Sequence, residues 1–219
     1  MKTRRLMSPK SSKERYKKNI PRVSTIVESH FPFEWEDKMR FHNWLANYRI
    51  SPEEYMEEAS SWWTYVHKAL EDYLDWKEFR WKKYVEFVKA WIQFIKDYWI
   101  VKIYTEHYIC TQFFQWTIDL VGEDKDWNLW LLDWKTYWLA KTKFWLWWWP
   151  YKKPYSKLKK AAMQLSLYAM ALGDSRLKWI AVIELCEDWS YHFHKLNRMD
   201  DAELMRIVLD YYYSYIDQI

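Results

Sequence analysis

Three short segments rich in β-branched and aromatic residues follow one another in the middle of the chain, with only polar turns between them. They are Ile100–Ile109, Gln112–Val121 and Asn128–Thr136. Segments of this length and composition predict strands, because such side chains fit a pleated, half-buried surface. We therefore expect a β-sheet to form part of the core.

Helical patterns lie on both sides of these strands. Residues 34–99 carry apolar side chains at helical spacing, and residues 51–54 (Ser-Pro-Glu-Glu) have the cap, the early proline and the early acids of a helix start. The later predicted elements are a helix over Leu158–Leu172 ended by Gly173, a hairpin of Trp179–Leu185 and Ser190–Leu196, and a helix over Asp200–Ile216. This order predicts one α/β domain with a helical N-terminal portion.

The domain is expected to span residues 23–219, with a helical N-terminal part at 34–99, a core at 100–196 and a C-terminal helix at 200–217. Residues 1–22 hold nine Lys and Arg against one Glu. Such a charge run predicts a disordered basic arm, which serves either solubility or a loose attraction to phosphates.

The composition excludes several protein classes. The longest apolar run, within Phe144–Pro150, is too short to cross a bilayer, so no membrane partner is expected. Cys110 and Cys186 are too few for a disulfide framework or an iron–sulfur cluster held by four thiolates. These features favour a reducing, cytoplasmic setting.

The chain is unusually rich in tryptophan and unusually poor in glycine. The 219 residues include 19 Trp and 2 Gly, where roughly 15 Gly are usual at this length. Asp126-Trp127 and Asp188-Trp189 stand where a hairpin turn needs positive φ, which glycine adopts cheaply and tryptophan does not. Either the chain has an aromatic-rich surface that binds carbohydrate or membrane, or its genome uses UGA for glycine and many of these Trp are natively Gly. The turn positions favour recoding.

Charged residues are placed together on two of the predicted strands. Asp119 lies on the second strand, and Asp133 and Lys135 lie two apart on the third, so the latter two project from the same face. A neighbouring strand can bring Asp119 beside them. Burying such groups without a purpose is costly, and paired carboxylates suit Mg²⁺. A surface ion pair is the plain alternative for Asp133 and Lys135 taken alone.

Further residues extend this pattern in a fixed order along the chain. They are His67 in a predicted helix, Glu106, Trp116-Thr-Ile-Asp119, Asp133-Trp134-Lys135-Thr136 and Gln164-Leu-Ser-Leu-Tyr168. The series resembles the PD-(D/E)XK nucleases, particularly the RecB-like exonuclease branch, whose pattern is a helical His, a Glu, Gly-x-x-Asp, Asp-x-Lys-Thr and Gln-x-x-x-Tyr. The resemblance covers roughly residues 60–196. Its main departure is Trp116, where the family has glycine, and recoding would restore the family residue.

The resemblance implies a restriction-endonuclease-like core (αβββαβ), with a central mixed sheet flanked by helices, and a metal centre within it. Asp119 and Asp133 would hold Mg²⁺ or Mn²⁺, with His67 and the backbone carbonyl of Trp134 as further ligands. The iron–sulfur variant of the family is not expected, because its four cysteines are missing. Lys135 would orient or help deprotonate the attacking water.

The remaining residues of the series have supporting roles in that resemblance. Glu106 would position a water or a ligand. Gln164 and Tyr168, four apart on one helix face, would orient Lys135 or contact a DNA phosphate, with a satisfied amide and a core aromatic as the plain alternative. His192 and His194 lie close to Cys186 without a complete zinc set and are interpreted as surface residues.

A lysine-rich stretch without acidic residues joins the predicted third strand to the Gln/Tyr helix, where it should border the site. Its cations are Lys141, Lys143, Lys152, Lys153, Lys157, Lys159 and Lys160. They predict a track for DNA phosphates, with a solvated charged loop as the alternative.

Together these residues predict a metal-dependent DNA nuclease, first an exonuclease in recombination, repair or phage DNA processing. DNA is the expected partner, with a helicase or recombinase as a possible second, in the cytoplasm of a prokaryote or a phage-infected host. An endonuclease of the same fold, or a non-catalytic DNA-binding module on a nuclease scaffold, is the alternative.

Overall fold

The computed structural model describes residues 19–31, 39, 42, 43, 46, 47, 49, 51–74, 85–136, 154–186 and 188–216. The helices are α2 (Val23–His30), α4 (Pro52–Leu74), α5 (Val85–Tyr98), α6 (Pro154–Leu172) and α7 (Asp201–Tyr211), which continues as a π-helix, η1 (Tyr212–Ile216). The strands are β1 (Val101–Cys110), β2 (Gln115–Glu123), β3 (Leu129–Thr136), β4 (Leu177–Leu185) and β5 (Tyr191–Leu196).

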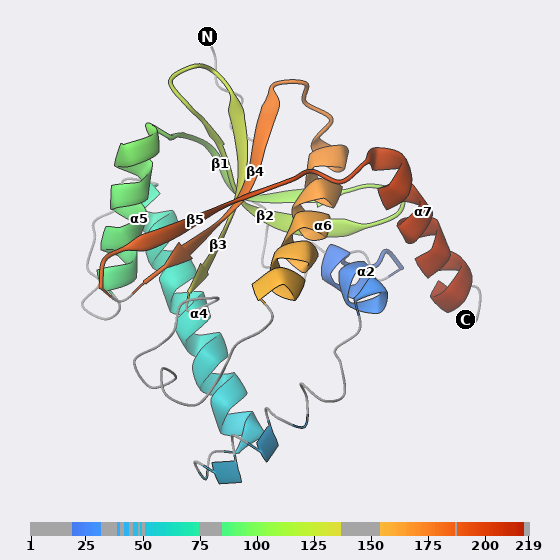
Figure 1. The fold of residues 1–219 in the computed structure, drawn as a ribbon, viewed down its shortest axis with the longest axis horizontal. Coiled ribbons are helices and arrows are strands. Elements are labelled where there is room, and N and C mark those ends of the chain that lie inside the picture. The colour runs from blue at the N-terminus through green and yellow to red at the C-terminus, as the bar shows by residue number, and fades with distance from the viewer. Residues whose placement is uncertain are drawn as a thin grey trace.

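The strands form one five-stranded sheet in the order β1-β2-β3-β4-β5 (Figure 1). Neighbouring strands pair antiparallel except for β3 and β4, which are parallel. Parallel neighbours need a crossover connection, and α6 lies in this one. The protein is therefore a mixed α/β fold with a helical N-terminal part, as the sequence predicts.

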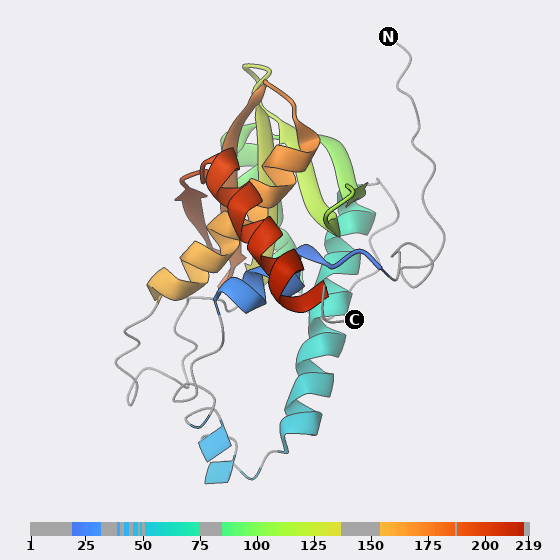
Figure 2. The same cartoon turned by 90° about the vertical axis from the view of Figure 1, so that its right-hand side faces the viewer.

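Helices cover both faces of the sheet (Figures 1 and 2). On one side, α2, α6 and α7 pack together, and their apolar residues join Ile118, Leu131 and Val182 in one buried cluster. On the other side, α4 and α5 pack over a second cluster that includes Leu132 and Ile183. We call these sides the α6 face and the α5 face. Because strand residues alternate between faces, β2, β3 and β4 each contribute to both clusters.

The predicted elements of the core are confirmed, with small shifts at their ends. Helix α6 begins at Pro154 rather than Leu158, and the predicted closing helix changes to a π-helix at Tyr212. The start of α4 is capped as expected: Ser51 Oγ accepts a hydrogen bond from the Glu54 amide at 3.0 Å, and Glu54 Oε2 accepts one from the Ser51 amide at 3.1 Å. None of the described helices is both long enough and apolar enough to span a bilayer.

Helix α2 was not predicted, and the residues before it contact the sheet. The Gln115 amide at the start of β2 donates to the Pro21 carbonyl at 3.0 Å, and Arg22 forms a parallel bridge with Gln115. Residues 20–22, which the sequence assigns to the end of the basic arm, therefore lie against β2. Residues 1–18 of that arm lie outside the described residues.

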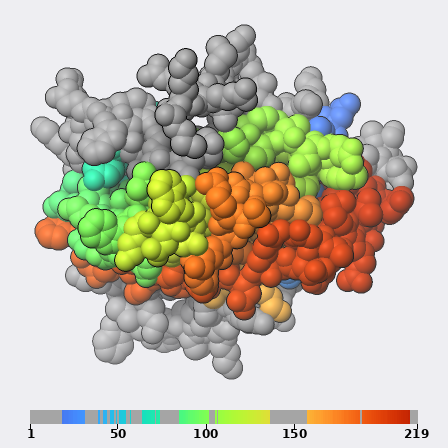
Figure 3. All heavy atoms as spheres, turned by 90° about the horizontal axis from the view of Figure 1, so that it is seen from above, coloured from blue at the N-terminus to red at the C-terminus, as the bar shows by residue number. Residues whose placement is uncertain are grey.

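Two chain connections lie side by side at one end of the sheet. The Leu129 amide donates to the Arg176 carbonyl at 3.0 Å, and Arg176 Nη1 lies 3.4 Å from Glu123 Oε2. Figure 3 looks onto this end, where the β2–β3 turn (yellow) lies beside the α6–β4 connection (orange). Strand β3 starts here, so Asp133 and Lys135 lie toward the opposite end, where α6 begins.

Three tryptophans have a backbone conformation that favours glycine. The φ angles are 52° at Trp99, 64° at Trp127 and 68° at Trp189. Trp99 follows α5, where the Ile100 amide bonds back to the Ile95 carbonyl in the arrangement of a Schellman cap. Gly173 has the matching position after α6, with φ of 59°. Positive φ is uncommon for a residue other than glycine, and bulky side chains make it strained.

These three side chains are also largely exposed, at 69%, 74% and 55% respectively. They differ from Trp91 and Trp134, which are 0% and 1% exposed and fill the cluster on the α5 face. The tryptophans thus fall into a packed group and a group at turn positions. The turn group supports the recoding hypothesis at Trp99, Trp127 and Trp189.

Candidate active site

The two aspartates of the sequence motif lie on adjacent strands. Leu120 on β2 pairs with Leu132 on β3, so the next step of the same register places Asp119 opposite Asp133. The backbone amide of Trp134 donates to Asp119 Oδ2 at 3.3 Å, which fixes that carboxylate beside β3. The sheet therefore brings together two acids that are 14 positions apart in sequence.

Asp133 and Lys135 form an ion pair on the α6 face. Lys135 Nζ lies 2.9 Å from Oδ1 and 2.8 Å from Oδ2 of Asp133. The Asp133 side chain is 6% exposed and that of Lys135 is 27% exposed. They share a face with the core residue Leu131, because residues two apart on a strand point the same way. A surface ion pair, the plain alternative, does not describe a carboxylate this buried.

The charge of Lys135 is maintained by both aspartates. Burial of the ammonium lowers the pKa of Lys135, but attraction to Asp133 and Asp119 and the hydrogen bond to Asp133 outweigh it and raise the pKa overall. Lys135 is therefore an ammonium at neutral pH. It can stabilise negative charge and orient a water, whereas accepting a proton from that water is disfavoured.

The donor set fits a hard divalent cation. Two carboxylates face one ammonium, which leaves a net negative charge at a partly buried position, and Mg²⁺ is commonly held by one or two carboxylates together with water and substrate phosphate. Among the described residues, no three His, Cys, Asp or Glu side chains are arranged as a metal-binding group. Asp119 and Asp133 are the side chains that the sequence motif assigns to a metal at this position.

His67 lies beside the motif, on the other face of the sheet. It is 7% exposed on α4, and its ring centroid is 5.3 Å from that of Trp134. Trp134 belongs to the cluster on the α5 face, whereas its neighbour Asp133 points to the α6 face. A ligand role for His67, and one for the Trp134 carbonyl, remain predictions.

A metal titration tests His67. An imidazole ligand suits Mn²⁺ better than Mg²⁺, so a ligating His67 predicts that Mn²⁺ supports cleavage at lower concentration, and that His67→Ala removes this advantage. We would titrate both metals at fixed pH and record the melting temperature of each protein. A variant with lower stability but an unchanged Mn²⁺-to-Mg²⁺ ratio would show that His67 only packs against Trp134.

The Gln/Tyr pair on α6 is internally bonded. Gln164 Nε2 donates to Tyr168 Oη at 2.7 Å, and Tyr168 is 2% exposed in the cluster on the α6 face. This arrangement agrees with the plain alternative, in which the Gln164 amide is hydrogen-bonded and Tyr168 is a core aromatic. Their proposed contact with Lys135 or with a DNA phosphate stays a prediction.

The other predicted site residues are only partly described. Glu106 lies on β1 between Thr105, which pairs with Leu120, and His107, which pairs with Ile118, so its backbone is opposite Asp119. Its side chain lies outside the described residues. The same holds for Lys141, Lys143, Lys152 and Lys153, whereas Lys157, Lys159 and Lys160 lie in the first turns of α6.

Sequence reasoning missed a second polar pair on the α6 face. Glu184 on β4 is 1% exposed and lies 3.1 Å from Nε2 of His194 on β5. Of the two histidines interpreted as surface residues, His192 is exposed and His194 is partly buried. The signal available in the sequence was an acid in an otherwise apolar strand, Ala181–Leu185.

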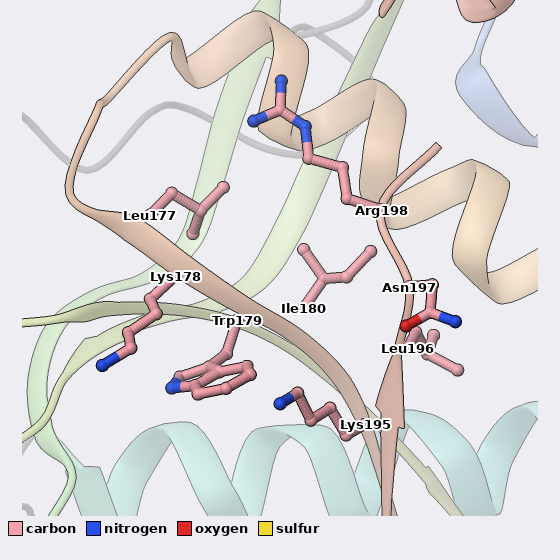
Figure 4. Close-up of a pocket in the computed structure, with 8 residues that line it drawn as sticks. All are labelled: Leu177, Lys178, Trp179, Ile180, Lys195, Leu196, Asn197 and Arg198. Atoms are coloured by element: carbon pink, nitrogen blue, oxygen red, sulfur yellow. The ribbon is translucent and has the colours of Figure 1, made fainter. Parts of the chain in front are cut away.

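A groove of about 340 Å³ lies at the opposite end of β4 and is distinct from the carboxylate site. Residues 177–180 and 195–198 line it, and Lys195 Nζ lies 3.0 Å from the centroid of the Trp179 ring (Figure 4). Arg198 in this groove is paired with Asp201 at 2.7 Å. The lining contains no carboxylate, so it lacks the groups that hold a metal in a nuclease.

The sequence matches no protein family and no curated protein at significant similarity. Among solved structures, the chain is similar to one titled "Crystal structure of SSO0001", with 15% sequence identity and a TM-score of 0.43. The similarity covers 89% of this chain and 76% of the other.

Proposed function

We propose that this protein is a divalent-metal-dependent deoxyribonuclease that hydrolyses phosphodiester bonds. The observation that carries the proposal is the convergence of Asp119, Asp133 and Lys135 on adjacent strands, with Asp133 buried and bonded to Lys135. Their order within the PD-(D/E)XK-like motif series supports the same function.

Each residue has a chemical task in this proposal. Asp119 and Asp133 would hold a divalent ion, which supplies charge stabilisation at a phosphate oxygen and acidifies a water. The Trp134 amide keeps Asp119 in place from β3. Lys135, held as an ammonium by Asp133, orients the attacking water and offsets charge that develops on the phosphate.

The direct test is incubation of the purified protein with linear DNA in Mg²⁺, in Mn²⁺ and in EDTA. Cleavage in either metal and its absence in EDTA are expected. Binding of DNA without cleavage in both metals would instead support the alternative of a non-catalytic DNA-binding module.

The exonuclease form of the proposal predicts a need for DNA ends. Linear duplex should be shortened progressively from its ends, and covalently closed circles of the same sequence should remain intact. Gel analysis of both substrates over time measures this. Nicking or linearisation of closed circles at a comparable rate would favour the endonuclease.

A further inference from the structure

The α6 face carries a second pair of a carboxylate and a basic group next to Asp133 and Lys135. Glu184 Oε2 lies 3.1 Å from His194 Nε2. The Glu184 side chain is 1% exposed and that of His194 23%, compared with 6% for Asp133 and 27% for Lys135. In both pairs the carboxylate is buried and about a quarter of its basic partner reaches solvent.

The strand registers place the two pairs side by side. Val182 on β4 pairs with Asp133 on one side and with His194 on the other, so Asp133 and His194 lie in one row across three strands. Glu184 pairs with Lys135 in the same way. Since neighbouring strands are about 4.8 Å apart, the backbones of Asp133 and His194 are separated by roughly 10 Å.

The Glu184 carboxylate has two effects on His194. It holds the imidazole in one orientation through Nε2, as carboxylates do for histidines that act through their other ring nitrogen. It also balances the positive charge of the imidazolium form, in which both ring nitrogens donate hydrogen bonds. Helix α6 begins at this end of the sheet (Figure 1), and Lys157, Lys159 and Lys160 in its first turns add positive charge.

We propose that His194, held in place by Glu184, binds a phosphate of the DNA strand next to the phosphate at Asp133 and Lys135. The site takes a phosphodiester oxygen as its ligand, and Glu184 is a positioning residue. This inference rests on the proposed action on DNA. It does not place His194 at the reacting atoms, so it predicts a role in affinity rather than in the chemical step.

The test is the salt dependence of DNA binding in EDTA, where no cleavage is expected. We would measure fluorescence anisotropy of a labelled linear duplex over a range of NaCl concentrations. At about pH 5.5, where an ordinary histidine is protonated, each contact of a cation with a phosphate contributes about 0.9 to the slope of log K against log salt, so His194→Ala and His194→Gln should each lower the magnitude of the slope by about one. Their affinity at fixed salt should fall by about tenfold, as expected for loss of a charged hydrogen bond.

Matched variants separate this contact from folding and from general charge. His194→Gln can still bond Glu184, so its melting temperature should stay near that of the wild type while the slope falls. Glu184→Gln should weaken binding in the same direction. His192→Ala, which removes the exposed histidine two residues away, should bind like the wild type. In cleavage assays, the His194 variants should raise KM for DNA with little change in kcat.

Wild-type slopes and affinities in both His194 variants would overturn the inference, as would an equal loss in His192→Ala. The proposed nuclease function can fail separately. In that case the slopes of the wild type and the His194 variants differ as expected, but the wild-type protein does not cut DNA in Mg²⁺ or in Mn²⁺. Conversely, metal-dependent cleavage with an unaltered slope in the His194 variants would retain the nuclease and remove the phosphate contact.

Discussion

Asp119→Ala, Asp133→Ala and Lys135→Ala should each abolish DNA cleavage. Asp119 and Asp133 would hold the metal, and Lys135 supplies the adjacent positive charge. Loss of one such group removes several kcal/mol of transition-state stabilisation, which is on the order of a hundredfold or more in rate. Initial rates on linear DNA at saturating Mg²⁺ and Mn²⁺ measure the effect.

The expected effects on folding differ between these variants. Lys135→Ala leaves the Asp133 carboxylate buried without its cation, so it should lower stability by about 3 kcal/mol. Asp133→Asn avoids that imbalance by removing the negative charge at nearly constant size, and it should be inactive while remaining folded. Asp126→Ala, in the exposed β2–β3 turn, is the control and should cut DNA at the wild-type rate.

Normal cleavage by two of the three alanine variants would show that the site assignment is wrong. Inactivity of Lys135→Ala is informative only when its thermal unfolding shows that the protein is folded at the assay temperature. Asp133→Asn provides the independent check, because loss of activity in a folded protein cannot be assigned to unfolding.

Replacing Trp99, Trp127 and Trp189 together by glycine should stabilise the protein. All three have positive φ and are more than half exposed, so glycine relieves backbone strain at each position, at the cost of the contact between Lys89 Nζ and the Trp189 ring, whose centroid lies 3.9 Å away. Relief of about 1 kcal/mol at each position is expected. For a chain of this size, the combined change corresponds to a rise in melting temperature on the order of 5–10 °C.

Two further variants test whether relief of backbone strain is the reason for the stabilisation. Trp91→Gly should destabilise the protein by at least 3 kcal/mol, because Trp91 is 0% exposed in the core. Gly173→Ala should cost about 1 kcal/mol from backbone conformation alone, since φ is 59° and an added Cβ meets no atom within 4 Å. A triple glycine variant that melts below the starting protein would contradict the strain argument.

The recoding hypothesis has its own measurement. Protein isolated from the native host should have an intact mass well below 27.6 kDa, with glycine at positions 99, 116, 127 and 189. Trp116 is included because the nuclease motif has glycine there, although its own φ is not positive. A native mass equal to that of the tryptophan sequence would remove the hypothesis.

Many elements of this fold could be predicted from local sequence alone, without knowledge of tertiary contacts. Alternating β-rich segments, the Ser51 cap and Gly173 located the strands, the start of α4 and the end of α6 to within a few residues, because each depends on neighbours in sequence. The same local chemistry identified Trp127 and Trp189 as turn residues. Trp99 was not identified, since a helix end without glycine has no clear signal.

The candidate site shows where sequence reasoning ends. The spacing of Asp133 and Lys135 placed both on one face of a strand, and the motif series associated Asp119 with them. Three contacts were decided only by the tertiary structure. The Trp134 amide donates a hydrogen bond to Asp119, and Glu184 is paired with His194. His67 packs on the opposite face of the sheet. These contacts depend on the order and register of strands, and pairing across a sheet is set by packing over the whole domain rather than by any local segment.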